Sequence, residues 1–579
     1  MVFSSHPRNS PHSGGSGWRN WTPWILLALI AFCFLGYLGW LRPADNFGGY
    51  HDDTLYFSAA QALARGEGYR MPSVPGSPPH TKYPVFYAWL LSHIWKWQPE
   101  FPANVGTAVW MTAFFAVWYL VAAFLCLRKV AGFGDWSALA PVALCAFQAH
   151  FLFLSGSVLS DMLFMALAMT AAVMADRALE RGSWILFALA GVVAGLSVMT
   201  RTLGLAVVAG IAGLALYRRA FRPAVVFCLA AAPFLAAGVL GPLTQPSLPI
   251  SAQEGGAGWR QTWLFYTSYL GYWKLSLLSP EVYWGMLQDR LAEFLMTPAD
   301  YCLFPPPGGR FSRLGRVISI TLTTGILIGA FRQARRGGWR AIHFIFALYT
   351  AAVLVSIQGQ ADRYFVLFLP LFYAGLWGEA RNLGQMVLSI LGSARPAGEK
   401  ALAGVLAAGL LVVAAVGAHH TVRGYRRQLA GQIRDRFALG EEKKQLYDWI
   451  RQNTDPGARF VAYEDICLYF YTGRQAMRPI AFSTAAFQIE NQGLLERELA
   501  HITDVARHIG ARYWVSAADD FHLEQLPPIV KRMAQVRSVL PLVFQSRGKR
   551  AQIYDLSCLF DSSRAECAAA APVLFPGGK

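Results

Sequence analysis

Long runs of apolar residues alternate with short polar connectors along most of the chain. A membrane-spanning helix needs about 20 mostly apolar residues, because each residue rises about 1.5 Å and the hydrocarbon core is about 30 Å thick. By this rule the sequence predicts about eleven membrane-spanning helices. They cover residues 21–41, 106–127, 135–154, 157–176, 183–200, 203–217, 223–244, 315–332, 341–358, 363–380 and 401–419. We therefore expect a mainly α, polytopic membrane protein.

Basic residues in the connectors predict how these helices are oriented. Cytoplasmic connectors of membrane proteins carry an excess of Lys and Arg, and the basic connectors here follow alternate predicted spans. They contain Arg128, Lys129, Arg177, Arg181, Arg218, Arg219, Arg222, Arg332, Arg335, Arg336 and Arg340. This pattern places the N-terminus inside and the C-terminal segment outside. Residues 1–20 are rich in Ser, Gly, His and Pro, which is typical of a disordered tail, here cytoplasmic.

The composition supports a membrane location and excludes other classes of protein. Hydrophobic residues make up 55% of the 579 residues and charged residues only 15%, whereas soluble domains average about 25% charged residues. An ordinary cytosolic enzyme is therefore excluded. The net charge of +17 comes mostly from the connectors, so it predicts contact with membrane lipids and no nucleic-acid partner.

The hydrophobic runs shorten and charged residues return after His420. We therefore divide the chain into a membrane module, residues 21–420, and a small exoplasmic α/β domain, residues 421–579. The domain is expected to contain helices over 441–453, 466–472 and 503–510, strands over 459–463 and 512–516, and a hairpin of 542–545 with 552–556. The oxidising side also permits a Cys558–Cys567 disulfide, although spacing leaves the pairing of the outer cysteines open.

The membrane module has two long outer loops, residues 42–105 and 245–314. In the second loop, Ser279 and Pro280 suit a helix cap and first turn. They predict an interfacial amphipathic helix that ends near Leu295.

The first outer loop places two adjacent acids at the start of a short helix. Residues 54–65 contain no Gly or Pro, and their apolar positions recur at helical spacing, which predicts a helix at the membrane interface. Asp52 and Asp53 then stand at its N-terminus. In a structural interpretation, Asp53 caps the helix and Asp52 interacts with the helix dipole. In a functional one, the pair supplies a base, with the second acid tuning it or binding a cation.

A second group of polar residues follows in the same loop. His80, Lys82 and Tyr83 come just before Pro84, which suits the first turn of an apolar, aromatic helix. Lys82 has two interpretations. It is either an ordinary interface lysine, whose aliphatic chain lies along an apolar surface, or a residue that contacts phosphate at the start of the helix. His80 and Tyr83 flank it as further candidates for substrate binding.

Three more charged residues lie at the outer ends of predicted spans, where each costs about 2.5–3.5 kcal/mol to insert. Asp161 opens the span at 157–176, and Arg201 and Arg363 break the charge rule for outer connectors. An anionic lipid headgroup explains the arginines, because guanidinium groups bind phosphate bidentately. The structural alternatives are a dipole partner for Asp161 and a local Asp362–Arg363 ion pair.

The run HDDTLYFSAAQALARGEGYR, followed by KYPVFYAWL, resembles the first outer loop of the polyprenyl-phosphate-dependent glycosyltransferases of the C superfold. These include protein O-mannosyltransferases and the bacterial lipid A aminoarabinose transferases. The resemblance implies that Asp52 is the catalytic acid, Asp53 the second acidic position and Lys82 the lysine of the donor phosphate. It also implies a bacterial inner membrane, with the active site and the C-terminal domain on the periplasmic side.

Further positions extend this resemblance. Asp161 matches an Asp at the head of a span, and the run from Asp362 to Phe365 resembles a late-span arginine motif of the superfamily. The Tyr-Thr-Gly-Arg run at Tyr471 is similar to the C-terminal domain of many bacterial members.

Together these residues predict an inverting sugar transfer. The donor is a polyprenyl-phosphate-linked sugar, with its phosphate near Lys82, Arg201 and Arg363, and the acceptor is a lipid, a glycan or a protein. Asp52 takes the proton from an acceptor hydroxyl; if the acceptor is a phosphate, Asp52 only orients it. Asp53 and Asp161 are the candidates for a divalent cation, Mg or Mn, although two isolated carboxylates do not specify one.

Two other functions remain open on the sequence alone. One is a secondary transporter, whose intramembrane charges would line a path. The other is a noncatalytic protein that binds lipid-linked sugars on the same scaffold.

Overall fold

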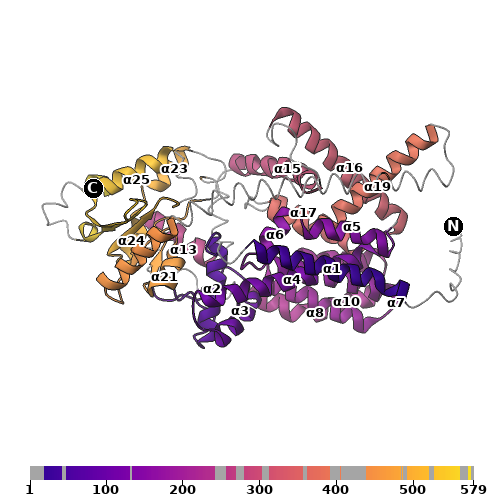
Figure 1. Ribbon diagram of the computed structural model, residues 1–579, viewed down its shortest axis with the longest axis horizontal. Coiled ribbons are helices and arrows are strands. Elements are labelled where there is room, and N and C mark those ends of the chain that lie inside the picture. The colour runs from indigo at the N-terminus through magenta and orange to yellow at the C-terminus, as the bar shows by residue number, and fades with distance from the viewer. Residues whose placement is uncertain are drawn as a thin grey trace.

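The computed structural model describes most of the chain. It covers residues 18–41, 47–130, 133–240, 256–268, 280–302, 312–355, 361–390, 405, 439–483, 486, 492–520, 527–560 and 571–574. The molecule is elongated: a helical bundle forms one end and a small sheet with its helices, in orange to yellow, forms the other (Figure 1). Helices α2 (His51–Ala64), α3 (Phe86–Trp97) and α13 (Gly256–Thr267) lie between them (Figure 1).

The bundle is built from the apolar runs of the sequence. Its elements are α1 (Trp18–Trp40), α4 (Ala103–Leu127), α5 (Asp135–Ala146), α6 (Ala149–Ser155), α7 (Asp161–Arg181), α8 (Trp184–Thr200), α9 (Gly204–Tyr217), α10 (Phe221–Leu235), the π-helix η2 (Ala236–Leu240), α15 (Pro280–Cys302), α16 (Arg313–Gly337), α17 (Ala341–Val355), α18 (Ala361–Tyr364), the 3-10 helix η3 (Phe365–Phe368) and α19 (Leu369–Ile390).

Predicted spans before residue 381 all fall on these helices, and the mainly α fold is confirmed. Within the described residues, five helices are long and apolar enough to cross a membrane, and the bent pair α5 and α6 would make a sixth. Helices α8, α9 and α17 are apolar but shorter. The count of eleven therefore stays a prediction, and the span at 401–419 lies outside the described residues. Residues 1–17 of the predicted tail also lie outside the described residues. The remaining three residues of that tail belong to α1, which begins at Trp18.

Three connectors predicted to be cytoplasmic meet in the structure. Glu180, at the end of α7, forms ion pairs with Lys129 after α4 (2.6 Å) and with Arg340 before α17. Nearby, Asp176 accepts a hydrogen bond from the backbone of Ala341 (3.0 Å). These contacts place the connectors on the same side, as the predicted orientation requires.

Helix α2 forms where it is expected but is not a surface helix. Every residue from Asp53 to Ala62 is buried. Phe57 packs against Trp95 of α3 and Phe470 of the C-terminal domain, with ring centroids 4.8 and 5.8 Å apart. The helix is therefore enclosed by protein on both sides, and its position at the membrane interface stays a prediction.

Helix α15 also departs from its predicted length. It begins at Pro280, as expected, but continues beyond Leu295 to Cys302.

The C-terminal domain is a five-stranded sheet with helices. The strands β1 (Phe460–Val461), β2 (Ala476–Met477), β3 (Tyr513–Ala517), β4 (Leu542–Gln545) and β5 (Ala551–Asp555) have the order β2-β1-β3-β5-β4. Strands β2, β1 and β3 are parallel, and β4 and β5 form the predicted antiparallel hairpin. Helical residues 439–453, α21 (Asp465–Thr472) and α24 (Asp504–Ile509) confirm the other predicted elements.

Some elements of this domain were not predicted. They are β2, α23 (Gln492–Leu499), α25 (Pro527–Val539), the 3-10 helix η4 (Ser557–Leu559) and α27 (Ala571–Leu574). Cys558 is disulfide-bonded, and its predicted partner Cys567 lies outside the described residues.

Candidate functional site

Asp52 lies in the first turn of α2 and is held in place by two side chains. The hydroxyl of Tyr83 donates a hydrogen bond to Asp52 Oδ1 (2.6 Å), and Arg363 Nη1 lies 3.2 Å from Oδ2. The Asp52 side chain is 24% exposed, whereas Arg363 is 7% exposed. The carboxylate is thus fixed from one side and remains open from another.

The segment before α3 carries the next site residues. Tyr83 stacks near Tyr56 of α2, with ring centroids 4.9 Å apart, and its backbone carbonyl accepts a hydrogen bond from Tyr69 (3.1 Å). Lys82 is buried, and its Nζ lies 3.7 Å from the centroid of the Phe265 ring in α13. The loop therefore brings a cation and a tyrosine hydroxyl to the start of α2.

Asp161 joins the two arginines that break the charge rule. It forms a bidentate pair with Arg363, with Nε–Oδ1 and Nη2–Oδ2 distances of 3.1 and 2.7 Å, and its Oδ1 lies 2.5 Å from Arg201 Nη1. The three residues come from the start of α7, the end of α8 and α18. Such a cluster tolerates burial because each charge has a partner of opposite sign.

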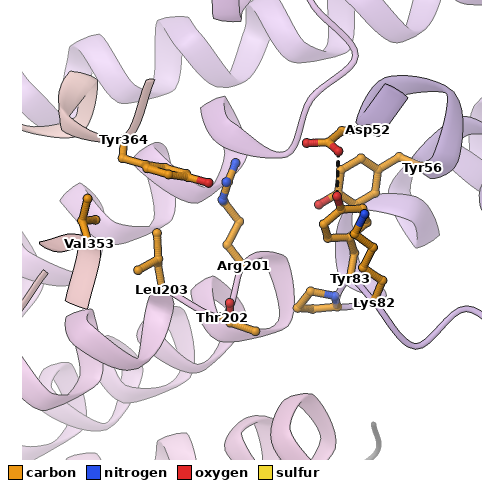
Figure 2. Close-up of a pocket in the computed structure, with 10 residues that line it drawn as sticks. Asp52, Tyr56, Lys82, Tyr83, Arg201, Thr202, Leu203, Val353 and Tyr364 are labelled. Carbon is orange, nitrogen blue, oxygen red and sulfur yellow. Dashed lines mark hydrogen bonds between the residues drawn. The ribbon is translucent and has the colours of Figure 1, made fainter. Parts of the chain in front are cut away.

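A cavity of about 140 Å³ opens beside these groups. Figure 2 shows Asp52, Tyr83 and Lys82 at one end of it, Leu203 and Val353 at the other, and Arg201 between them. Its remaining lining residues are Tyr56, Pro84, Thr202 and Tyr364. The cavity is therefore charged at one end and apolar at the other.

Electrostatics distinguish the two adjacent acids. Burial would raise the pKa of Asp52, but Arg363, Lys82 and the Tyr83 hydrogen bond hold that pKa well below its usual range. Burial raises the pKa of Asp53 well above its usual range. At neutral pH, Asp52 is therefore a carboxylate, whereas burial disfavours the charged form of Asp53. Burial also lowers the pKa of the Lys82 ammonium to about 8.

Four predicted site residues do not line the cavity: Asp161 and Arg363, which pair with each other beside it, and the buried Asp53 and His80. Asp53 accepts a hydrogen bond from the backbone N–H of Gly48 (3.1 Å) and is 2% exposed. The helix N-cap is Tyr50, so Asp53 is not the capping residue. His80 is buried and stacks on Tyr69, with centroids 4.8 Å apart, and burial lowers its pKa to about 3.

The predicted cation ligands are engaged elsewhere. Asp161 is paired with two arginines, and Asp53 hydrogen-bonds the backbone before α2. In the described part of the chain, no three His, Cys, Asp or Glu side chains gather into a group that could hold a metal ion. These residues do not fit a divalent cation.

A second polar cluster, which the sequence analysis did not identify, adjoins Asp52. His51 Nε2 lies 3.2 Å from Oδ1 of Asp465, at the start of α21, and the hydroxyl of Tyr266 in α13 donates to Asp465 Oδ2 (2.5 Å). Burial lowers the pKa of His51 to about 4, so its ring is neutral at pH 7. No sequence motif marks this cluster, because its members come from three distant segments.

Comparisons with known proteins identify the fold. No protein-family model matches the chain, and a search of curated sequences finds no significant match. Among solved structures, apo ArnT from Cupriavidus metallidurans is similar at a TM-score of 0.51 and 13% identity, over 93% of this chain and 98% of that one.

The archaeal oligosaccharyltransferase AglB from Archaeoglobus fulgidus is also similar. Its complex with an inhibitory peptide and a dolichol-phosphate has a TM-score of 0.51 and 13% identity, over 93% of this chain and 74% of that one. The apo form of the Archaeoglobus enzyme has a TM-score of 0.51 and 14% identity, over 87% and 70%. These neighbours are GT-C-fold, polyprenyl-phosphate-dependent glycosyltransferases, and the resemblance in fold expected from the first outer loop is confirmed.

Proposed function

We propose that this protein is a membrane glycosyltransferase that moves a sugar from a polyprenyl-phosphate donor to an exoplasmic acceptor with inversion. The observation that carries the proposal is the carboxylate of Asp52, fixed by Tyr83 and Arg363 at the charged end of a cavity whose other end is apolar. The GT-C fold, found also in a complex with a dolichol-phosphate, supports this class of donor.

The cavity suits a lipid-linked phosphate. Lys82 and Arg201 line its polar part and would bind the phosphate, while Leu203 and Val353 would contact the first apolar units of the lipid. Arg363 lies just behind Asp52 and adds positive charge where the leaving phosphate gains negative charge.

The reaction then needs one proton acceptor. The acceptor oxygen attacks the anomeric carbon as the bond from that carbon to the phosphate oxygen breaks, and the bonding electrons leave with the phosphate. The acceptor proton passes to Asp52. In the free protein Asp52 is a weak base, because its pKa is held low by Arg363 and Lys82. A bound phosphate partly neutralises these cations, so it raises the pKa of Asp52 and makes it a better base.

Asp53 takes a supporting part in this scheme. Its buried carboxyl accepts a hydrogen bond from the backbone N–H of Gly48 and so fixes the turn that leads into α2. The acceptor remains a lipid, a glycan or a protein. We place the site on the exoplasmic side of the membrane, as the orientation of the basic connectors predicts. The resemblance of the first outer loop implies that this is the periplasmic side of a bacterial inner membrane.

The test compares Asp52→Asn with Asp53→Asn in purified protein. Both are supplied with labelled polyprenyl-phosphate sugars and a membrane extract as acceptor, and transferred label is measured. Loss of a general base lowers the rate by about 10²- to 10⁴-fold, which we expect for Asp52→Asn only. Asp53 does not line the cavity, and Asn keeps an oxygen that can accept from Gly48, so Asp53→Asn should retain activity within about threefold of wild type.

The outcomes separate the parts of the proposal. Equal activity of the Asp52→Asn protein and the wild type would reject the base while keeping the enzyme class. No transfer by wild type from any donor that it binds would argue instead for the noncatalytic binding protein.

A further inference from the structure

Arg478 of the C-terminal domain points its charge toward the membrane module. It directly follows the edge strand β2, and its backbone N–H lies 3.2 Å from the hydroxyl of Tyr266. Its Nε donates to the carbonyl of Tyr463 (3.0 Å), and the guanidinium lies 4.2 Å from the Tyr463 ring centroid. The side chain is thus fixed, while its terminal nitrogens have no hydrogen-bond partner among the described residues.

Arg478 and Lys82 share one aromatic ring. Arg478 Cζ lies 5.4 Å and Lys82 Nζ 3.7 Å from the centroid of Phe265. The ring stabilises both cations. Burial lowers the pKa of Lys82 and the positive charge of Arg478 lowers it further, so the two cations repel one another. Lys82 also lines the cavity beside Asp52. Positive charge therefore continues from the cavity to the C-terminal domain.

Polar contacts hold the domain in this position. Asp465 is fully buried and is bound by both His51 and Tyr266. His51 directly precedes Asp52, and Tyr266 directly follows Phe265. The same contacts that attach the C-terminal domain therefore set the distance between Arg478 and Lys82.

We propose that Arg478 and Lys82 together bind one phosphate group, so that the C-terminal domain forms a wall of the substrate site. The inference rests on the proposed function and adds a binding residue from a second domain. Arg478 and Phe265 are partly exposed, so a ligand can reach them. A phosphate placed between the two cations relieves their repulsion and gains hydrogen bonds from the terminal nitrogens of Arg478. The phosphate belongs either to the lipid-linked donor or to a phosphorylated acceptor.

The test measures binding, which requires neither the sugar nor turnover. Purified full-length wild type, Arg478→Gln, Arg478→Lys and the control Arg497→Gln are titrated in detergent with labelled undecaprenyl phosphate. Arg497 is exposed on α23 of the same domain, so its change matches the loss of charge. A second titration adds labelled inorganic pyrophosphate to protein saturated with the lipid. Thermal unfolding checks that each variant is folded.

The two titrations distinguish the source of the phosphate. Weakening of lipid binding by tenfold or more in Arg478→Gln, with smaller effects in Arg478→Lys and none in Arg497→Gln, assigns the site to the donor. If Arg478→Gln weakens the binding of pyrophosphate by the same factor and leaves lipid binding unchanged, the site belongs to the phosphorylated acceptor. Unchanged binding of both probes by folded Arg478→Gln overturns the inference and leaves the proposed function intact. If wild type does not bind the lipid, the proposed function fails and the inference with it.

Discussion

At the scale of single residues, the site uses burial to give neighbouring acids different roles. Asp52 and Asp53 are adjacent in sequence, but their side chains enter different surroundings. Asp52 meets Arg363 and the Tyr83 hydroxyl, whereas Asp53 is buried, which disfavours its charge, and accepts a hydrogen bond from the backbone of Gly48. The pKa values of two adjacent acids are therefore shifted in opposite directions.

Lys82 should determine the alkaline side of the pH profile. In the proposed function its charged form binds the donor phosphate. Because burial lowers the pKa of Lys82 to about 8, donor binding should weaken as pH rises through that value. The profile of kcat/KM reports the free enzyme, and it should fall with an apparent pKa of about 8. Lys82→Arg keeps its charge to higher pH and should remove this fall, even if the maximal rate is lower.

The matched control for this profile is Lys96→Arg, because Lys96 is an exposed residue of α3. Its profile should coincide with that of wild type. An alkaline fall that persists unchanged in Lys82→Arg would assign the titration to a different group.

Part of the site could be predicted from residue positions alone. Arg201, Arg363 and Asp161 are charges at the outer ends of apolar spans, and such ends meet at one depth in a bundle. The structure brings them together beside Asp52. Their roles in the reaction stay predictions. The inward rotation of Asp53 and His80 could not be predicted, because it depends on packing against Gly48 and Tyr69.

At the scale of elements, apolar periodicity predicted where helices form better than it predicted what those helices pack against. Helix α2 forms as expected, yet it is enclosed by α3 and the C-terminal domain, because Phe57 and its neighbours have aromatic partners on both. Strand β2 has only two residues, too few for a periodic pattern. The sequence therefore did not identify Arg478 as a candidate site residue, because that strand determines its position.

Helices α16 and α19 should be sensitive to a single methyl group. A Cβ at Gly329 would collide with the backbone carbonyl of Gly375, whereas a Cβ at Gly325 of the same helix would meet nothing within 4 Å. Close backbone approach at small residues is a common way to pack membrane helices. Gly329→Ala should therefore lower the free energy of unfolding by about 1–3 kcal/mol. Unfolding in a denaturing detergent titration measures the change.

Gly325→Ala provides the control in the opposite direction. It adds the same methyl group without a clash, and Ala favours a helix over Gly by about 1 kcal/mol. We expect unchanged or slightly higher stability. Equal destabilisation by both substitutions would show that helix packing at Gly329 is not the cause.

At the scale of the whole molecule, the distribution of charge agrees with the position of the site. The connectors that carry Lys129, Glu180 and Arg340 meet at one place, whereas α2, α3 and α13 adjoin the C-terminal domain (Figure 1). The bundle lies between the two groups. A lipid-linked donor can then enter from the membrane while its phosphate reaches Lys82 at the boundary of the bundle and the C-terminal domain.

This arrangement predicts which positions a membrane-impermeant thiol reagent can reach. Ser538 is exposed on α25 of the C-terminal domain, and Arg181 is exposed at the end of α7 beside Glu180. In intact cells, Ser538→Cys should be labelled and Arg181→Cys should not; both should be labelled after the membrane is permeabilised. Wild type, which keeps its own cysteines, provides the background. Labelling of Arg181→Cys in intact cells would reverse the orientation. The site would then face the cytoplasm and could not reach a periplasmic acceptor. The positive-inside rule would no longer explain the basic connectors.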